Sequence, residues 1–212
     1  MEIFYRSALL AVAAFSLAAC PFSLWIGKWL LSKDIKGYGD GNPGAYNVFR
    51  AGGWKAGVSA MVLDIAKGMP FVALAHYYFE LPMVAVMAIG LCAILGHAYS
   101  PLMHFQGGKA LAVTGGVMFA LPQHEIVISV LTFMFLGFLL IDVDGWRVMF
   151  SMGASLIYLA VTKGISLEPL FILCVIAILA VTHFDELKTM PRFRGKLITW
   201  LEARKMAKLR GH

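Results

Sequence analysis

The sequence predicts an all-α, polytopic membrane protein with about seven transmembrane helices. Hydrophobic residues make up 60% of the 212-residue chain and charged residues only 14%, whereas a soluble domain carries about 25% charged residues. The mean hydropathy is +0.77, and seven apolar stretches alternate with short polar segments. No linker or low-complexity tract divides the chain, so we expect one membrane-integral domain over residues 1–212.

The apolar stretches are candidate membrane helices, and the segments between them are rich in Gly, Pro and charged residues. The stretches cover residues 7–31, 55–77, 81–97, 109–122, 125–141, 147–162 and 167–183. The first stays apolar past Cys20, which favours a membrane helix over a cleaved lipoprotein signal. Several are shorter than the ~20 residues that a straight span needs, so we expect them to cross a thinned bilayer or to stop short around a cavity.

Positive charge is concentrated on alternate polar segments. Eight of the 18 Lys and Arg residues follow residue 187, and others lie in segments 32–55, 98–109 and 142–147. The remaining polar segments hold Arg6 and Lys163. Because cytoplasmic segments are enriched in Lys and Arg, we predict an outside N-terminus and a cytoplasmic C-terminus. The basic tail indicates contact with anionic membrane lipids and not with nucleic acid.

The cysteines predict neither a disulfide framework nor a metal site. Cys20, Cys92 and Cys174 all lie inside apolar stretches, without paired spacing and without a histidine at metal-ligand distance. We therefore expect them to pack as small apolar side chains.

The longest polar segment contains "GDGNPGAYNVFRAGG", residues 39–53. Its glycines, Gly44 among them, allow a ligand to approach the backbone closely. Asn42 and Asn47 bring side-chain donors and acceptors, and Arg50 has the planar fork that suits a phosphate or a carboxylate. The alternative is a connecting loop in which Arg50 binds lipid phosphate.

A second polar cluster lies at "GHAYSPLMHFQGGKALAVTGG", residues 96–116. Gly107 and Gly108 precede Lys109 at the start of an apolar run, where backbone N–H groups and a lysine can form an anion cradle. The spacing differs from that of a P-loop. His97 is either part of the same site or a helix-end residue that binds a carbonyl.

Two further groups carry ionisable side chains. Asp64 and Lys67 lie three residues apart on a predicted membrane helix, so they form either a self-neutralising pair or part of a cavity. His183 closes the last apolar stretch. The predicted topology places the 39–53 segment, Lys109 and His183 at the cytoplasmic face. Such a site fits an enzyme acting on a phosphorylated, partly apolar substrate, and it also fits an anion transporter.

These motifs resemble those of the bacterial acyl-phosphate:glycerol-3-phosphate acyltransferases. The family motif S-G-N-P-G-A-T-N-x-x-R-x-x-G is similar to residues 40–53, and its D-x-x-K-G is similar to residues 64–68. A second motif, G-H-x-x-P-x-x-x-F-K-G-G-K-G-V-A-T, is similar to residues 96–113, and a final motif places a histidine at His183. The order and spacing of the motifs cover nearly the whole chain.

The chain departs from the family motifs at several positions. Asp40 replaces the family's serine, and Tyr46 replaces its threonine in the first motif. In the second motif Gln106 replaces a lysine and Val113 a threonine, and in the last motif Glu186 replaces an asparagine. Two of these changes introduce carboxylates and one removes a cation, which weakens a phosphate site. The resemblance therefore indicates a divergent member, and an altered donor or acceptor is the alternative.

The resemblance implies transfer of a fatty acyl group from acyl phosphate to the sn-1 hydroxyl of glycerol 3-phosphate, which gives lysophosphatidic acid for phospholipid synthesis. The site would face the cytoplasm from the inner membrane. Because acyl phosphate is already activated, we expect no cofactor. The catalytic residues would be Asp40, Arg50, Lys109 and His183. The substrate-binding residues would be Asn42, Gly44, Asn47, Lys67, His97, Gly107, Gly108 and Ser151.

The topology predicts that position 109 and the C-terminal tail are reached from the same, cytoplasmic, face. The measurement is labelling of a single cysteine at position 109 and of a C-terminal tag by membrane-impermeant reagents in sealed vesicles of known orientation. A cysteine at position 163 is the control, since it should be labelled from the other face. Labelling of position 109 and of the tail from opposite faces would refute this topology.

Overall fold

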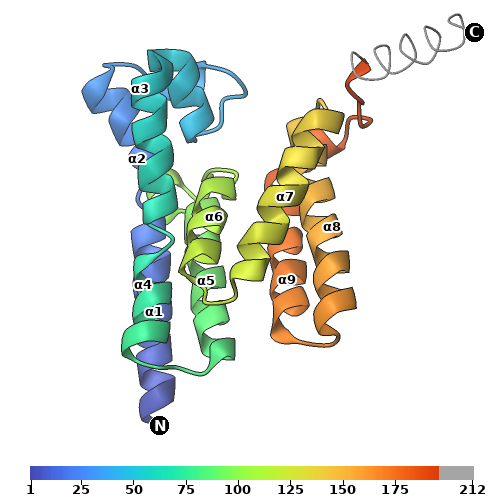
Figure 1. Ribbon diagram of the computed structural model, residues 1–212. Coiled ribbons are helices and arrows are strands. Elements are labelled where there is room, and N and C mark those ends of the chain that lie inside the picture. The colour runs from blue at the N-terminus through green and yellow to red at the C-terminus, as the bar shows by residue number, and fades with distance from the viewer. Residues whose placement is uncertain (196–212) are drawn as a thin grey trace, which may run out of the picture.

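The computed structural model describes residues 1–195, which fold into helices joined by short loops (Figure 1). The α-helices are α1 (Glu2–Ala18), α2 (Phe22–Trp25), α3 (Ala45–Ala66), α4 (Pro70–Ala73), α5 (Met83–Ala98), α6 (Leu111–Ala120), α7 (His124–Leu140), α8 (Asp144–Lys163), α9 (Leu167–Thr182) and α10 (Phe184–Leu187). Short π- or 3-10-helical segments are η1 (Ile26–Leu30), η2 (Ile35–Gly37), η3 (Leu74–Tyr78) and η4 (Pro101–Met103). Within residues 1–195 the one β-type pairing is an isolated bridge between Ile141 and Phe193. The part of the basic tail beyond residue 195 lies outside the described residues.

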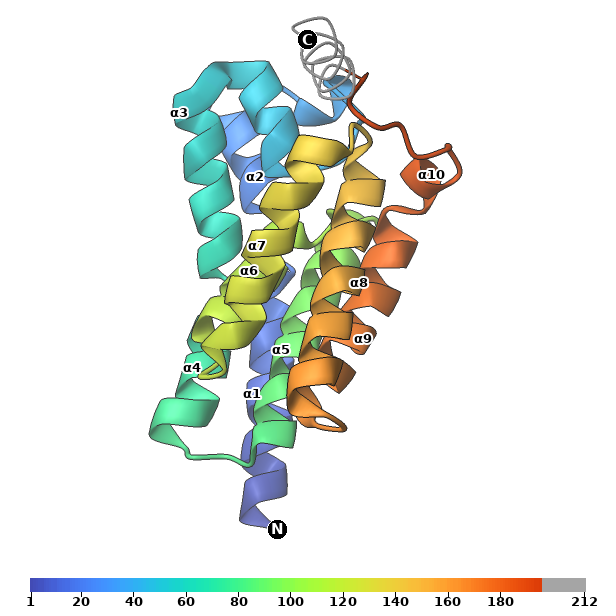
Figure 2. The ribbon, with the colours of Figure 1, turned by 45° about the vertical axis from the view of Figure 1, so that its right-hand side comes forward.

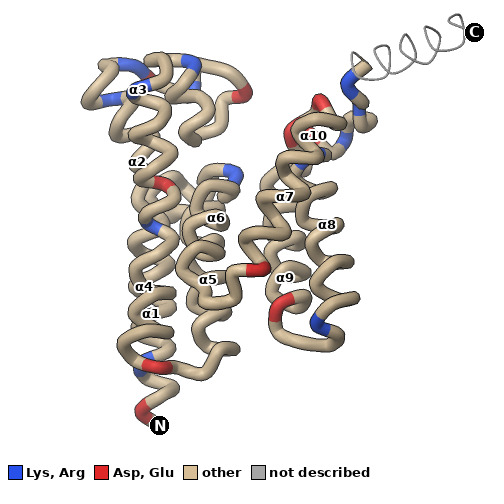
Figure 3. Tube along the Cα trace, in the orientation of Figure 1, with Lys and Arg blue, Asp and Glu red and all other residues tan. Residues whose placement is uncertain are grey.

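The long helices run side by side as a bundle (Figures 1 and 2). Helix α1 packs along α5, α3 contacts α6, and α7, α8 and α9 pack in sequence, with α5 joining α9. One apolar core cluster extends from α1 through α4 to α9. The N-terminus lies at one end of the bundle and the 183–195 segment at the other, where most of the drawn Lys and Arg positions also gather (Figure 3). We call this second end the polar end.

Each of the seven predicted apolar stretches is mostly helical, but the first is interrupted at residues 19–21 and the second at residues 67–69. Among the described residues, three helical segments are long and apolar enough to cross a membrane, namely Glu2–Leu30, Ala45–Tyr78 and Met83–Met103. Three shorter apolar helices cover Leu111–Ala120, His124–Leu140 and Leu167–Thr182. The second segment begins ten residues before the predicted residue 55, because the polar residues from Ala45 onward are already helical; α3 then bends at Gly53, whose φ is +77°. Glycine adopts this conformation at little cost, and it lets the first two turns of α3 lie across the polar end (Figure 1).

Helix α6 is too short to cross a bilayer. Its 10 residues rise about 15 Å, whereas a hydrocarbon core is about 30 Å thick. The preceding loop is irregular, with positive φ angles at His104, Phe105 and Ala110. Irregular backbone at membrane depth is tolerated where protein surrounds it or where it lines a cavity. The middle of this loop is exposed at His104 and Phe105, whereas Gly108 and Ala110 on either side of Lys109 are buried, so the end of the loop places Lys109 at the interior of the polar end.

A buried charged cluster secures the break between α1 and α2. Asp64 and Lys67 are 2% and 4% exposed, and their side chains pair at 2.9 Å. Ser23 donates a hydrogen bond to Asp64 Oδ2 at 2.7 Å. Lys67 Nζ donates to the carbonyl of Cys20 at 2.8 Å, and the Ser100 hydroxyl donates to the neighbouring carbonyl of Ala19 at 2.6 Å. These side chains bind carbonyl groups at the point where the first helix is interrupted, so the cluster has a structural role.

We expect Lys67→Met to destabilise the protein strongly, because it leaves the Asp64 carboxylate buried without its cation. Breaking one partner of a buried pair costs about 3–5 kcal/mol, which corresponds to a decrease of roughly 10 °C in the unfolding midpoint for a chain of this size. The measurement is thermal unfolding in detergent.

The control for Lys67→Met is Lys163→Met, which breaks the exposed pair between Lys163 and Glu125. Exposed pairs contribute about 0.2–1 kcal/mol, so the midpoint should fall by less than about 4 °C. Adding Asp64→Asn to Lys67→Met should restore part of the loss. Equal effects of the two lysine substitutions would show that the buried cluster is not a stability element.

Candidate active site

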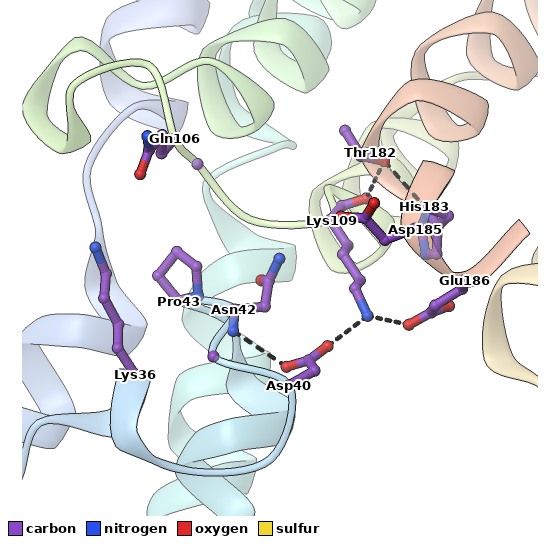
Figure 4. Close-up of a pocket in the computed structure, with 12 residues that line it drawn as sticks. Lys36, Asp40, Asn42, Pro43, Gln106, Lys109, Thr182, His183, Asp185 and Glu186 are labelled. Atoms are coloured by element: carbon purple, nitrogen blue, oxygen red, sulfur yellow. Dashed lines mark hydrogen bonds and ion pairs between the residues drawn. The ribbon is translucent and has the colours of Figure 1, made fainter. Parts of the chain in front are cut away.

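Three segments that are distant in the sequence meet around one cavity at the polar end of the bundle (Figure 4). The cavity has a volume of about 350 Å³. Its lining residues come from the 36–43 segment, from the loop before α6, and from the end of α9 with the residues that follow it. They are Lys36, Asp40, Gly41, Asn42, Pro43, Gln106, Gly107, Lys109, Thr182, His183, Asp185 and Glu186.

The first segment is held in shape by Asp40 and Asn47. Asp40 Oδ1 accepts hydrogen bonds from the backbone N–H of Asn42 at 3.1 Å and from Asn47 Nδ2 at 2.9 Å. Asn47 Nδ2 also donates to the carbonyl of Asn42 at 2.8 Å. Gly39 has a φ of +60°, and a Cβ there would overlap Asn47 Oδ1. Asn47, 1% exposed, therefore positions the loop, while Asp40 and Asn42 face the cavity (Figure 4).

Lys109 joins all three segments through its charge. Its ammonium group forms close ion pairs with the carboxylates of Asp40 and Glu186 (Figure 4). Burial alone would lower the pKa of Lys109, but the hydrogen bonds and charges of Asp40 and Glu186 outweigh it and raise this pKa. For Asp40, partial burial alone would raise the pKa of the carboxyl group. The hydrogen bonds and charge of Lys109 and the N–H donors of Asn42 and Asn47 outweigh burial, so this pKa is lowered overall. Lys109 and Asp40 are therefore both charged at neutral pH.

The third segment fixes the backbone of Lys109 and presents a histidine. The Thr182 hydroxyl donates to the carbonyl of Lys109 at 3.1 Å. His183 Nδ1 lies 2.9 Å from the carbonyl of Leu179. A carbonyl only accepts, so Nδ1 carries the proton and Nε2 of the neutral ring is left as an acceptor. Burial lowers the pKa of His183, against the opposing effects of the Leu179 carbonyl and of Glu186, which keeps the ring neutral at neutral pH.

The glycine amides of the second segment do not form the expected anion cradle. The N–H of Gly107 donates to the carbonyl of Ala98 at 3.0 Å, and that of Gly108 donates to the carbonyl of His97 at 3.2 Å. A Cβ on Gly107 would overlap the carbonyl oxygen of His97, and a Cβ on Gly108 would overlap its Nε2. The two glycines are therefore required for close packing of the loop against the end of α5. The loop lies there because its backbone completes the hydrogen bonds at the end of that helix.

Several predicted site residues lie outside the cavity. Arg50 is exposed on the first part of α3, where its guanidinium donates to the Tyr46 hydroxyl at 2.7 Å and lies 4.9 Å from the ring centroid. Arg50 lies beside Gly39 but is not among the residues that line the cavity. Gly44 forms the N-cap of α3. Ser151 is fully buried and donates to the carbonyl of Val130 at 2.9 Å, which joins α8 to α7.

Lys67 and His97 are also absent from the cavity lining. Both are at most 5% exposed, and His97 Nδ1 lies 4.0 Å from Asp64 Oδ1. His97 thus lies between the buried charged cluster and Gly108. Seven lining residues were not predicted as site residues from the sequence, although two of them, Gln106 and Glu186, were noted as departures from the family motifs. The seven are Lys36, Gly41, Pro43, Gln106, Thr182, Asp185 and Glu186. The signal for Thr182 and Asp185 was their closeness in sequence to His183.

The fold and the cavity define a helical membrane protein with a polar, mixed-charge site at one end of an apolar bundle. Residues 8–192 match the family described as glycerol-3-phosphate acyltransferase, and the chain belongs to this family. A glycerol-3-phosphate acyltransferase of Lactococcus lactis subsp. cremoris is 42% identical over 110 residues, which are 52% of this chain and 51% of that protein. The chain thus spans about half the length of this relative. The Streptococcus pneumoniae enzyme is 29% identical over 206 residues, 91% of this chain and 93% of that protein.

A solved structure supports the same family. The glycerol 3-phosphate form of PlsY, an integral membrane glycerol 3-phosphate acyltransferase, superposes with a TM-score of 0.75 at 29% identity and covers 86% of this chain and 90% of its own. The lysophosphatidic acid form of PlsY gives a TM-score of 0.72 at the same identity and coverage. The predictions of an all-α, polytopic membrane protein and of this family are confirmed. The count of seven spans and their orientation stay predictions.

We expect Gly108→Ala to displace the loop that carries Lys109, because its new Cβ meets the His97 ring. Overpacking of this kind costs about 1–3 kcal/mol. The measurements are the midpoint temperature of thermal unfolding and the rate of acyl transfer, and both values should fall. Gly115→Ala is the control, since Gly115 lies in α6, where an added Cβ would have no atom within 4 Å and alanine favours a helix. An unchanged midpoint and rate in Gly108→Ala would contradict the packing role of this glycine.

Proposed function

We propose that the protein transfers a fatty acyl group from acyl phosphate to the sn-1 hydroxyl of glycerol 3-phosphate at the cytoplasmic face of the cytoplasmic membrane. The hydroxyl oxygen forms an ester bond with the acyl carbon, the bond from that carbon to the phosphate oxygen breaks, and inorganic phosphate leaves. The hydroxyl proton goes to a base in the site. The product is lysophosphatidic acid.

The observation that carries this proposal is the position of Lys109 in the cavity. Its ammonium lies where the three polar segments meet (Figure 4), at the end of an apolar bundle that can lie in the lipid with the acyl chain. The family match over residues 8–192 supports the same reaction. So do the names of the relatives and the two forms, glycerol 3-phosphate and lysophosphatidic acid, in which PlsY was solved.

Positioning and charge are the main contributions that this reaction needs from the protein. Because the donor is an acid anhydride, a phosphate is already a good leaving group and no covalent enzyme intermediate is required. Lys109 can offset the charge of a substrate phosphate or of the tetrahedral oxyanion. Asn42 and Thr182 add polar groups at the cavity wall.

His183 is the better of the two candidate bases. A general base works best when its pKa lies near the operating pH. The pKa of Asp40 is lowered and its carboxylate is paired with Lys109, so Asp40 accepts a proton poorly. The ring of His183 is neutral. Its proton is on Nδ1, which donates a hydrogen bond to the Leu179 carbonyl, so Nε2 is free to accept a proton. We therefore propose that His183 Nε2 accepts the proton of the glycerol 3-phosphate hydroxyl.

The direct test is an assay with purified protein in detergent, offered palmitoyl phosphate and glycerol 3-phosphate. The proposal expects lysophosphatidic acid and inorganic phosphate in equal amounts. Uptake of glycerol 3-phosphate or phosphate into sealed proteoliposomes without product formation would overturn it in favour of a transporter.

We expect Lys109→Ala to lower kcat/KM by about tenfold to a hundredfold, because it removes charge-assisted hydrogen bonds to the substrate. Turnover and thermal stability are measured together. Lys55→Ala is the control, since Lys55 is exposed on α3 outside the cavity lining. Full activity in Lys109→Ala would remove this residue from the site, and a loss of activity that follows unfolding would make its role structural.

A further inference from the structure

Carboxylates of the protein already occupy Lys109, the lysine that a substrate phosphate would bind. Lys109 pairs with Asp40 and Glu186, while the third carboxylate of the lining, Asp185, pairs with Lys188 at 2.7 Å. An ammonium group has three donors, and two of the three donors of Lys109 are used by these carboxylates. The lining holds three carboxylates against two lysines, which are Lys36 and Lys109. A phosphate that enters therefore meets a lysine paired with two carboxylates, a group that together carries one net negative charge.

The two carboxylates are held to different degrees. Asp40 Oδ1 is bound by the N–H of Asn42 and by Asn47 Nδ2, so this side chain is part of the loop structure. Glu186 has a longer side chain on the short helix α10, and its Oε2 is buried without a hydrogen-bond partner among the described residues. An unpartnered buried carboxylate oxygen is costly. Glu186 is therefore held in place by fewer hydrogen bonds than Asp40.

We propose that Asp40 and Glu186 compete with the acceptor phosphate for Lys109 and thereby set the affinity of the site for the acceptor. The phosphate of the acceptor binds by displacing the carboxylate of Glu186 from Lys109, while Asp40 stays in place on its loop. The competition lowers the affinity for glycerol 3-phosphate below the value that the same cavity would have with uncharged side chains at positions 40 and 186. This inference rests on the proposed function for the identity of the acceptor.

The test is equilibrium binding of glycerol 3-phosphate to the purified full-length protein in detergent, by calorimetry and without an acyl donor. Asp40→Asn and Glu186→Gln are close in shape to the native side chains, and Asn retains an Oδ1 that accepts from the loop. Each variant should tighten binding by about threefold to tenfold, and the double variant should bind more tightly than either. Inorganic phosphate, as a second probe, should show the same order.

Asp185→Asn is the matched control, because it removes the same charge from the same lining without touching Lys109. It should change the affinity by no more than about twofold. Thermal unfolding of each variant without ligand shows that it is folded. Equal tightening in all three acidic variants would overturn the inference in favour of general electrostatic repulsion. Unchanged or weaker binding in Asp40→Asn and Glu186→Gln would overturn it too, as would undetectable binding in every variant.

The binding test and the acyl-transfer assay fail independently. If both variants bind more tightly but the native protein makes no lysophosphatidic acid, the competition for Lys109 is supported and the proposed reaction is wrong. Product formation with unchanged affinities would keep the reaction and remove the competition.

Discussion

Lys109 forms ion pairs with Asp40 and Glu186, and these contacts connect side chains that lie 69 and 77 residues apart in the sequence. Each carboxylate belongs to a different segment of the polar end, so one lysine links the three walls of the cavity (Figure 4). Partial burial makes such contacts stronger than they are in open water. The same contacts neutralise the lysine, so the interaction that assembles the site also limits its attraction for an anion.

The position of this lysine depends on a short helix and two glycines. Helix α6 has 10 residues and cannot reach both surfaces of a bilayer, and Gly108 and Ala110 at the end of the loop before it are buried. The amides of Gly107 and Gly108 complete the hydrogen bonds at the end of α5. His97, whose Nδ1 lies 4.0 Å from Asp64 Oδ1, is placed between this loop and the buried cluster of Asp64 and Lys67, which secures the interrupted first helix. Stability and site geometry are therefore linked from the core to the cavity.

Hydropathy predicted the helices because lipid-facing and core-facing residues are both apolar, and all seven apolar stretches are mostly helical, although it missed the breaks at residues 19–21 and 67–69. The bend at Gly53 was missed because a single glycine in a helical pattern does not reveal its φ angle. The charge pattern also placed the 39–53 segment, Lys109 and His183 at one face, and the structure brings parts of all three segments to one cavity.

Motif spacing could not predict which polar groups are already occupied within the protein. Arg50 is bound by Tyr46, and the amides of Gly107 and Gly108 are bound by carbonyls. Ser151 lies between two helices as a packing residue. Such contacts depend on rotamers and on backbone direction, which a sequence motif does not encode. The carboxylates at Asp40 and Glu186 were visible as departures from the family pattern, but their shared partner emerged from the tertiary structure.

The proposed reaction depends above all on binding of the substrate phosphate by Lys109 in this cavity. The most direct measurement is an experimental structure of the protein with glycerol 3-phosphate bound. We predict a phosphate oxygen within hydrogen-bonding distance of Lys109 Nζ, with the carboxylate of Glu186 moved away and Asp40 still bound to Asn42 and Asn47. A phosphate bound elsewhere, with both carboxylates still paired to Lys109, would contradict this role of the lysine.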